Sequence, residues 1–250
     1  MNIGMIIFIV ILIIIIIIII RSYIVNNNIL TKLSDAKIMQ TIPSGSLATS
    51  SKIGSSNYAY SIWFYINDWN YKYGEEKIIF ARQAPSNPST SGTSGTPTAV
   101  GSDPQPCVIL GSITNDLIID LTVYSDISRK KTPIPPCTIQ NVPIQQWVNF
   151  TMSVYGKTLD TYINGKLVKT CILPGIPYIN NTLDVYVTPL GGFDGSTSKL
   201  AYYPNSLNPE QAWNIYEDGY SGGILSNLTG AYQLNLSVLQ NGKQEASLTI

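Results

Sequence analysis

An unbroken apolar run, bounded by Ile3 and Ile20, opens this chain of 250 residues and ends in eight consecutive isoleucines. At about 1.5 Å per residue, a helix of this length nearly crosses a bilayer core of about 30 Å. A cleaved secretory signal would need a basic segment before the run and a small-x-small motif after it, and neither is present. The run therefore predicts an uncleaved transmembrane anchor over residues 1–22.

The charges that flank this run indicate its orientation. Arg21, Lys32 and Lys37 follow it, whereas no Lys or Arg precedes it. The positive-inside rule then places the large C-terminal part on the cytoplasmic side of the membrane. We expect the polar residues 23–45 to form a juxtamembrane stalk, with a first short strand near Leu47.

Composition excludes several classes of function. Histidine is absent, which removes the usual general base, the commonest zinc ligand and the Ser-His or Cys-His nucleophile. Adjacent Glu75 and Glu76 would point to opposite sides of a strand, so they do not form the carboxylate pair of a glycosidase. With 15 basic and 15 acidic residues, the chain also lacks the basic surface of a nucleic-acid-binding protein. We expect no enzymatic activity and no nucleic-acid partner.

Alternation with a period of two dominates the rest of the chain. Residues 57–67 are apolar on both faces, which predicts a central strand, and residues 146–171 predict a three-stranded meander with a tight Asn164-Gly165 turn. Trp63 and Trp147 are predicted core anchors. Residues 85–106 are rich in Pro, Gly, Ser and Thr and predict a mobile loop.

One short helix and a terminal hairpin complete the prediction. Asn208 is a good helix cap, Pro209 suits the first helical position, Gln211 completes a capping box, and Gly219 ends the helix. An Asn241-Gly242 turn predicts a hairpin near the C-terminus. Together these signals indicate an all-β, two-sheet antiparallel sandwich over residues 46–223, with a hairpin extension over residues 224–250 that packs on or beside it.

Three cysteines permit at most one internal disulfide. Cys137 follows two prolines and Cys171 ends a predicted strand, which makes them the preferred pair over pairings with Cys107. Three buried reduced thiols are the alternative if the domain faces the cytosol.

Several motifs resemble those of a known superfamily in their order and spacing. They are Tyr60-Ser61-Ile62-Trp63-Phe64-Tyr65, Trp147-Val148-Asn149-Phe150, Asp160-Thr161-Tyr162-Ile163-Asn164-Gly165-Lys166, Gly192-Phe193-Asp194-Gly195 and Leu207-Asn208-Pro209-Glu210-Gln211. From about residue 45 to residue 222, the chain resembles the concanavalin A-like lectin/glucanase superfamily in its laminin G-like form. The resemblance implies a jelly-roll sandwich. It implies no hydrolase, because the carboxylate motif of the glucanase members is missing.

The isoleucine anchor and the aromatic run over residues 63–71 resemble, more narrowly, membrane-anchored proteins of large nucleocytoplasmic DNA viruses. In such giant viruses an internal membrane lies beneath an icosahedral capsid. The resemblance implies a virion component, a minor capsid protein or a protein that links capsid and membrane, whose partners are other virion proteins. The alternative is a lectin-like module that binds glycans for host attachment.

Two sets of residues are candidate sites. The laminin G-like resemblance implies a calcium ion at a sandwich rim, and Asp116 and Asp194, which lie in predicted turns, are its candidate ligands. The alternative, which we favour, is that Asp is simply a good turn residue and that no cofactor binds. Trp69, Tyr71 and Tyr73 lie just past the aromatic strand, where alternation no longer requires burial. Their rings are candidates for partner contact or for stacking on sugars.

Overall fold

The computed structural model describes residues 28–47, 56–83, 103–125 and 131–221, residues 12, 13 and 16, and the backbone of residues 235–240 and 243–249. The predicted anchor over residues 1–22 therefore lies almost entirely outside the described residues, as does most of the predicted loop over residues 85–106. Within the described residues, none of the helices has the length and apolar character needed to span a bilayer.

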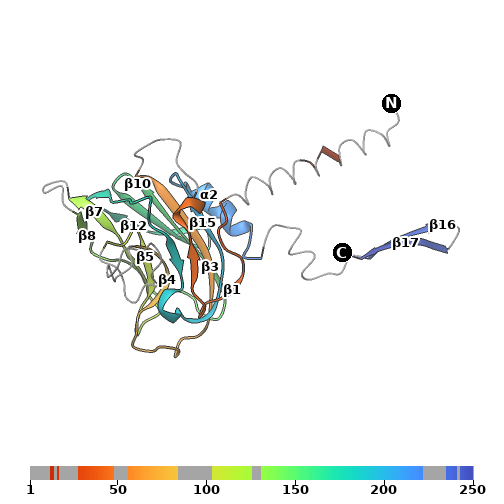
Figure 1. Cartoon of the computed structure of the whole chain (residues 1–250), viewed down its shortest axis with the longest axis horizontal. Helices are drawn as coiled ribbons and strands as arrows, with labels where there is room; N and C mark the ends of the chain where they lie inside the picture. The colour runs from red at the N-terminus through yellow and green to blue at the C-terminus, as the bar shows by residue number, and fades with distance from the viewer. Residues whose placement is uncertain are drawn as a thin grey trace.

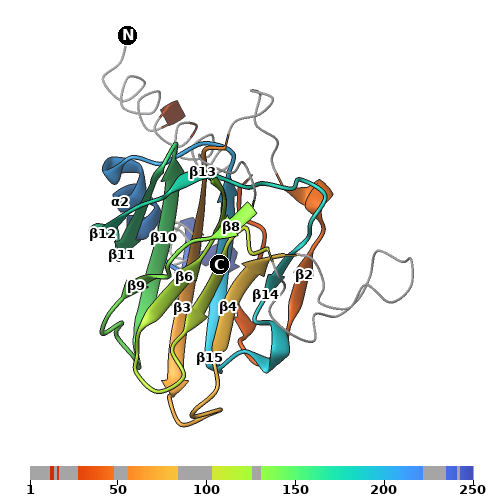
Figure 2. The same ribbon diagram turned by 90° about the vertical axis from the view of Figure 1, so that its left-hand side faces the viewer.

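Two antiparallel sheets of six strands form a sandwich (Figures 1 and 2). The first sheet contains, in spatial order, β1 (Ser34–Asp35), β15 (Asp194–Tyr203), β3 (Tyr58–Asp68), β10 (Trp147–Tyr155), β11 (Thr158–Ile163) and β12 (Lys166–Ile172). The second contains β2 (Gln40–Ile42), β14 (Val185–Val187), β4 (Lys77–Arg82), β5 (Cys107–Leu110), β6 (Leu117–Asp120) and β9 (Cys137–Ile139). A smaller sheet joins β13 (Gly175–Pro177), β7 (Thr122–Ser125) and β8 (Lys131–Pro133). The predicted all-β two-sheet sandwich is confirmed.

The hydrophobic core lies between the two large sheets. Alternate residues of β3 point into it, and Tyr60, Ile62 and Phe64 are fully buried there. Phe150 of β10 lies directly opposite Ile62 in the antiparallel register and belongs to the same core. As predicted, β3 is a central strand, between β15 and β10, and the meander of β10, β11 and β12 turns at Asn164-Gly165.

The outer face of the first sheet is covered by the helix α2 (Pro209–Glu217). Its predicted capping box is present, since the Asn208 side chain accepts from the Gln211 N–H and the Gln211 side chain accepts from the Asn208 N–H. Aromatic rings attach the helix and the segment after it to the sheet. Trp63 stacks on Tyr216 with ring centroids 5.6 Å apart. Trp147 stacks on Tyr220 at 4.3 Å.

These stacks place Trp63 and Trp147, the predicted core anchors, on the outer face of the first sheet rather than between the two sheets. Trp63 is buried, but beneath α2, and Trp147 is only partly buried. Both point away from the second sheet because they alternate with the inward residues Phe64 and Val148. Alternation identified the two faces of these strands, but not which of them would meet the other sheet.

The sandwich begins earlier in the chain than predicted. Residues 34–35 and 40–42, placed in the expected stalk over residues 23–45, form β1 and β2 at the edges of the two sheets. Ile29 forms an isolated bridge with Ala201 of β15. Leu47 is not in a strand; it follows a short 3-10 turn, η1 (Ser44–Ser46), and is buried. The boundary at residue 46 is therefore wrong.

A second two-stranded unit lies near the C-terminus. β16 (Asn235–Gln240) and β17 (Lys243–Thr249) pair as an antiparallel hairpin, as the Asn241-Gly242 turn predicts. The two strands form a sheet of their own. The packing of this extension on or beside the sandwich stays a prediction, because residues 222–234, which connect the two, lie outside the described residues.

Candidate binding surface

Four loops gather at one end of the sandwich, the lower end in Figure 2. They connect β3 to β4, β5 to β6, β9 to β10 and β14 to β15, and the last contains the short turn η2 (Pro189–Gly191). The loop between β5 and β6 joins two paired strands of the second sheet, whereas the other three loops cross from one large sheet to the other.

Hydrogen bonds join each loop to its neighbour. The Gly74 N–H donates to the Ser112 carbonyl at 2.9 Å, and the Val142 N–H donates to the Asn115 carbonyl at 2.8 Å. The Lys72 ammonium donates to the Leu190 carbonyl. Because the backbone of one loop is fixed by the next, the end of the sandwich is a braced surface rather than a set of independent loops.

Exposed apolar side chains project from this braced end. Tyr73 is 59% exposed and Ile113 is 62% exposed. Three further residues, each at least a third exposed, share the same loops or border them: Ile38, Ile144 and Leu190. The Ile38 carbonyl accepts from Thr188 at 3.0 Å, which holds it beside η2. We call these five residues the apolar rim; such gatherings are typical of contact surfaces.

The three predicted contact aromatics lie at this end but differ in role. Trp69 packs partly against the core, donates its indole N–H to the Ile113 carbonyl at 3.1 Å, and carries the Lys77 ammonium 4.6 Å from its ring centroid. The Tyr71 hydroxyl donates to the Gly191 carbonyl at 3.1 Å, and the Lys37 ammonium lies 4.9 Å from the Tyr71 ring. Only Tyr73 presents an open ring. Trp69 and Tyr71 brace the surface instead.

The buried Lys77 is an unusual component of this end. Its side chain is almost fully buried, and its ammonium has no hydrogen-bond partner. Desolvation lowers the pKa of Lys77 because the charged form loses water, and Glu75 opposes this shift. The negative face of the Trp69 ring compensates part of the buried charge.

The two acids considered for calcium have protein partners of their own. Asp194 forms an ion pair with Lys37 and accepts from Asn67 at 3.0 Å; the hydrogen bond from Lys37, followed by that from Asn67, lowers the Asp194 pKa. Asp116 accepts from the Thr114 hydroxyl at 2.7 Å. Nowhere in the described residues do three or more acidic, cysteine or histidine side chains form a group suited to a metal ion. The favoured expectation that no cofactor binds and the alternative of calcium both stay predictions.

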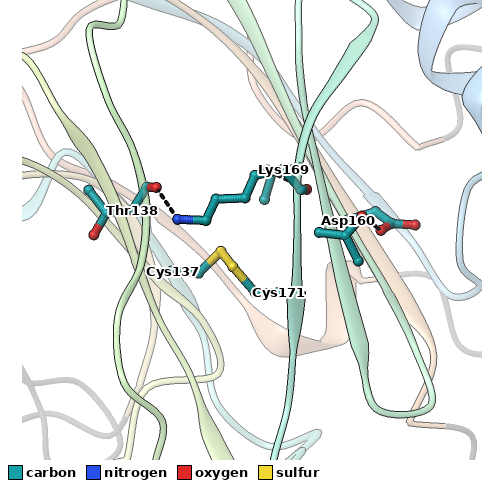
Figure 3. Close-up of a disulfide and its surroundings, with 7 residues drawn as sticks. Cys137, Thr138, Asp160, Lys169 and Cys171 are labelled. Atoms are coloured by element: carbon teal, nitrogen blue, oxygen red, sulfur yellow. Dashed lines mark hydrogen bonds between the residues drawn. A yellow bond between two sulfur atoms is a disulfide. The ribbon is translucent and has the colours of Figure 1, made fainter.

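A cleft opens beside the rim, between β9 with the loop after it and the edge strand β12. Its volume is about 630 Å³. A disulfide joins Cys137 of β9 to Cys171 of β12, the pair preferred from the sequence, and the Lys169 ammonium donates to the Thr138 carbonyl at 2.8 Å (Figure 3). These two bridges tie the edges of the large sheets together at one end of the cleft. Its lining residues are Thr138, Ile139, Gln140, Asn141, Val142, Pro143, Ile163, Val168 and Lys169.

Comparison with known proteins assigns this chain to no family. No protein-family model matches the chain, and no curated protein is detectably similar in sequence. Among the solved structures that match are binding domains of botulinum neurotoxins. The type G receptor-binding domain has 16% identity and a TM-score of 0.44 over 74% of this chain. The serotype D ligand-binding domain in complex with N-acetylneuraminic acid has 13% identity and a TM-score of 0.46 over 77% of this chain.

A third match, the type DC binding domain in complex with rat synaptotagmin II, has 15% identity and a TM-score of 0.42 over 64% of this chain. This chain covers 46%, 49% and 35% of the three neurotoxin domains, respectively, which is less than half of each. At these values we assign no ligand, partner or activity from the likeness.

Four of the five rim residues were not predicted from the sequence. Ile113, Ile144 and Leu190 are apolar residues inside turn segments, where neither a strand nor a helix requires an apolar side chain. An apolar residue in such a turn segment is the sequence signal that could have identified them. Their convergence with Ile38 and Tyr73 depends on the sheet topology, which sequence spacing does not specify.

Proposed function

We propose that this protein is a non-enzymatic binding module and that the apolar rim is the surface with which it contacts a protein partner. The observation that carries the proposal is the exposure of five apolar side chains on loops that brace one another. A braced surface loses little conformational entropy on binding, and each buried apolar side chain contributes about 1–2 kcal/mol.

The faces of two of the three predicted contact aromatics are covered by lysine side chains, which favours a protein partner over a glycan. Sugar recognition by stacking needs an open aromatic face beside polar groups, but the Trp69 and Tyr71 rings each carry a lysine ammonium of the same chain. The described lining of the neighbouring cleft contains no aromatic side chain. Tyr73 alone would have to supply the platform. Glycan binding is the second candidate, supported by that one exposed ring.

The absence of histidine supports the proposal of a non-enzymatic role, and so do the partners of the acids at this end. Asp194 is paired with Lys37, and Asp116 is hydrogen-bonded within its own turn. Neither acid is free to act as a general base. The membrane anchor and a place in a virion, between internal membrane and capsid, rest on the sequence alone and are part of the proposal.

A site-specific photo-cross-linker tests the rim. The full chain, produced in its native setting, carries the cross-linking residue at position 73 or, as a control, at position 155; Tyr155 is 66% exposed but lies at the turn between β10 and β11, at the opposite end of the sandwich. We expect one protein adduct from position 73 and none from position 155. The same adduct should disappear when Ile113 and Leu190 are both changed to Ser.

A glycan array with the same chain supplies the opposing outcome. Specific glycan binding that is abolished by Tyr73→Ala and retained in the Ile113→Ser, Leu190→Ser double variant would overturn the proposal of a protein-contact rim. Hydrolysis of any bound oligosaccharide would overturn the proposal of a non-enzymatic module.

A further inference from the structure

The strand β12 is an exposed sheet edge of a kind that folded proteins normally avoid. It is seven residues long, and none of those residues is buried. Leu167, Val168 and Ile172 are each close to half exposed or more, and Ile172 reaches 85%. The other three edges of the large sheets are short, since β1 has two residues and β2 and β9 have three each. Long apolar edges present unpaired N–H and C=O groups and are sites of strand addition.

The hairpin of β16 and β17 lacks a third strand among those that the structure describes. A two-stranded hairpin in water is at best marginally stable, and a third strand is usually required. Its register places Leu236 opposite Leu248 and Val238 opposite Ala246, while Ser237 lies opposite Ser247. Apolar and polar pairs therefore alternate along the hairpin, as in a sheet that has one covered face.

The two elements match in length. β17 has seven residues, as β12 has. β12 carries Lys166 and Lys169 and no acid, whereas β17 carries one acid, Glu245, in its interior and one lysine, Lys243, at its first position. Lysines on an edge strand resist unspecific pairing, so a partner strand that brings an acid is favoured over one that does not.

We propose that β17 of one copy of this chain adds to the free edge of β12 in a second copy. Among the described strands, β16 and β17 pair only with each other and β12 pairs only with β11, so pairing between copies would give the hairpin a third strand and β12 a second neighbour. The contact joins two different surfaces and is therefore heterologous, which makes it able to repeat from copy to copy. It uses a surface other than the apolar rim and extends the proposed function from a single module to a row of modules.

Cysteine cross-linking between two differently tagged full chains in detergent tests this contact. One chain carries Leu167→Cys and the other carries Ser247→Cys, and an oxidant is added after mixing. We expect a cross-linked species that contains both tags. The matched control replaces Leu167→Cys by Tyr73→Cys, which places an equally exposed thiol on the rim; this pair should give at least tenfold less cross-linked product.

Two outcomes would overturn the proposal. One is equal cross-linking from positions 73 and 167. The other is a Leu167→Cys, Ser247→Cys double variant that closes only within one chain, which would mean that the hairpin covers its own β12. A further variant, Val168→Lys, adds a charge to the exposed edge without touching the core. It should abolish the mixed species while the circular dichroism spectrum stays unchanged, and persistence of that species would count equally against the pairing.

Discussion

Opening the disulfide between Cys137 and Cys171 should reduce the stability of the sandwich by an amount that follows from the chain length it encloses. The two cysteines are 34 residues apart in the sequence. In the chain-entropy relation, closing a loop of that length removes about 13 cal/mol/K from the unfolded ensemble, which is about 3.8 kcal/mol at 25 °C. For a domain of this size, that loss corresponds to a fall in Tm of roughly 10 °C.

Equilibrium unfolding in guanidinium chloride, with and without reductant, measures this difference. The Cys137→Ala, Cys171→Ala double variant should match the reduced wild type and should no longer respond to reductant. Cys107→Ala is the control: Cys107 is buried and unpaired, and burial raises the pKa of its thiol, so it should lose some packing energy while keeping the full response to reductant. A change in unfolding free energy below about 1 kcal/mol on reduction would refute the entropic reasoning.

The oxidation state of these cysteines also indicates the compartment in which the domain resides. Disulfides persist in oxidising compartments, whereas the three basic residues after the isoleucine run favour the cytoplasmic side. A thiol count on protein taken directly from its native setting separates these alternatives. One free thiol per chain indicates an oxidising environment, and three indicate the cytosol.

Three further predictions concern the described residues. Asn149→Ala should cost about 2–3 kcal/mol in chemical unfolding, because it removes the two hydrogen bonds that Asn149 makes with the buried Ser61 and Thr151 hydroxyls, which keep their bond to each other; exposed Asn70→Ala should cost far less. Lys37→Met should raise the Asp194 pKa in an NMR titration, whereas Lys32→Met should not, and an unchanged Asp194 titration in Lys37→Met would contradict the pairing. Because the folded state lowers the Asp194 pKa, the stabilisation from Asp194 is present above the unfolded pKa and is lost as pH falls through the folded pKa. Gly192→Ala should destabilise the fold by several kcal/mol in a thermal unfolding assay, because φ is +42° and a Cβ would lie 2.1 Å from the Ala36 carbonyl oxygen. In that assay Gly45→Ala should be near neutral, because a Cβ at Gly45 would have no atom within 4 Å.

The sequence was most informative where the pattern is local. Strict alternation and the Asn164-Gly165 turn were sufficient to predict the meander of β10, β11 and β12, because both depend on residues close together in the chain. The capping box of α2 is local in the same way. Strands β1 and β2 were missed because two or three residues have no measurable period, and they are held by pairing with β15 and β14, more than a hundred residues away.

The candidate surface was predicted only in part for a related reason. The aromatic cluster after β3 indicated the correct end of the sandwich, but whether each ring is open depends on where Lys37 and Lys77 lie in three dimensions. Residue type cannot distinguish Tyr71, which is covered by a lysine from a distant segment, from Tyr73, which is not. The rim itself is assembled by topology, since Ile38 and Leu190 come from opposite ends of the sequence.

The antiparallel run of residues 28–36 along β15 has a geometric consequence for the rim. The chain enters this run where the Asn28 carbonyl accepts from Tyr202, near the far end of β15, and reaches the loop end where the Ala36 N–H donates to Gly195. The stretch from Gly195 to Tyr202 contains a bulge and pairs with Tyr60 to Ile66 of β3, so at about 3.3 Å per residue it spans about 20 Å. With the preceding residues held in a bilayer, as the sequence predicts, the sandwich is a rigid spacer that sets its contact surface about that far from the point of attachment.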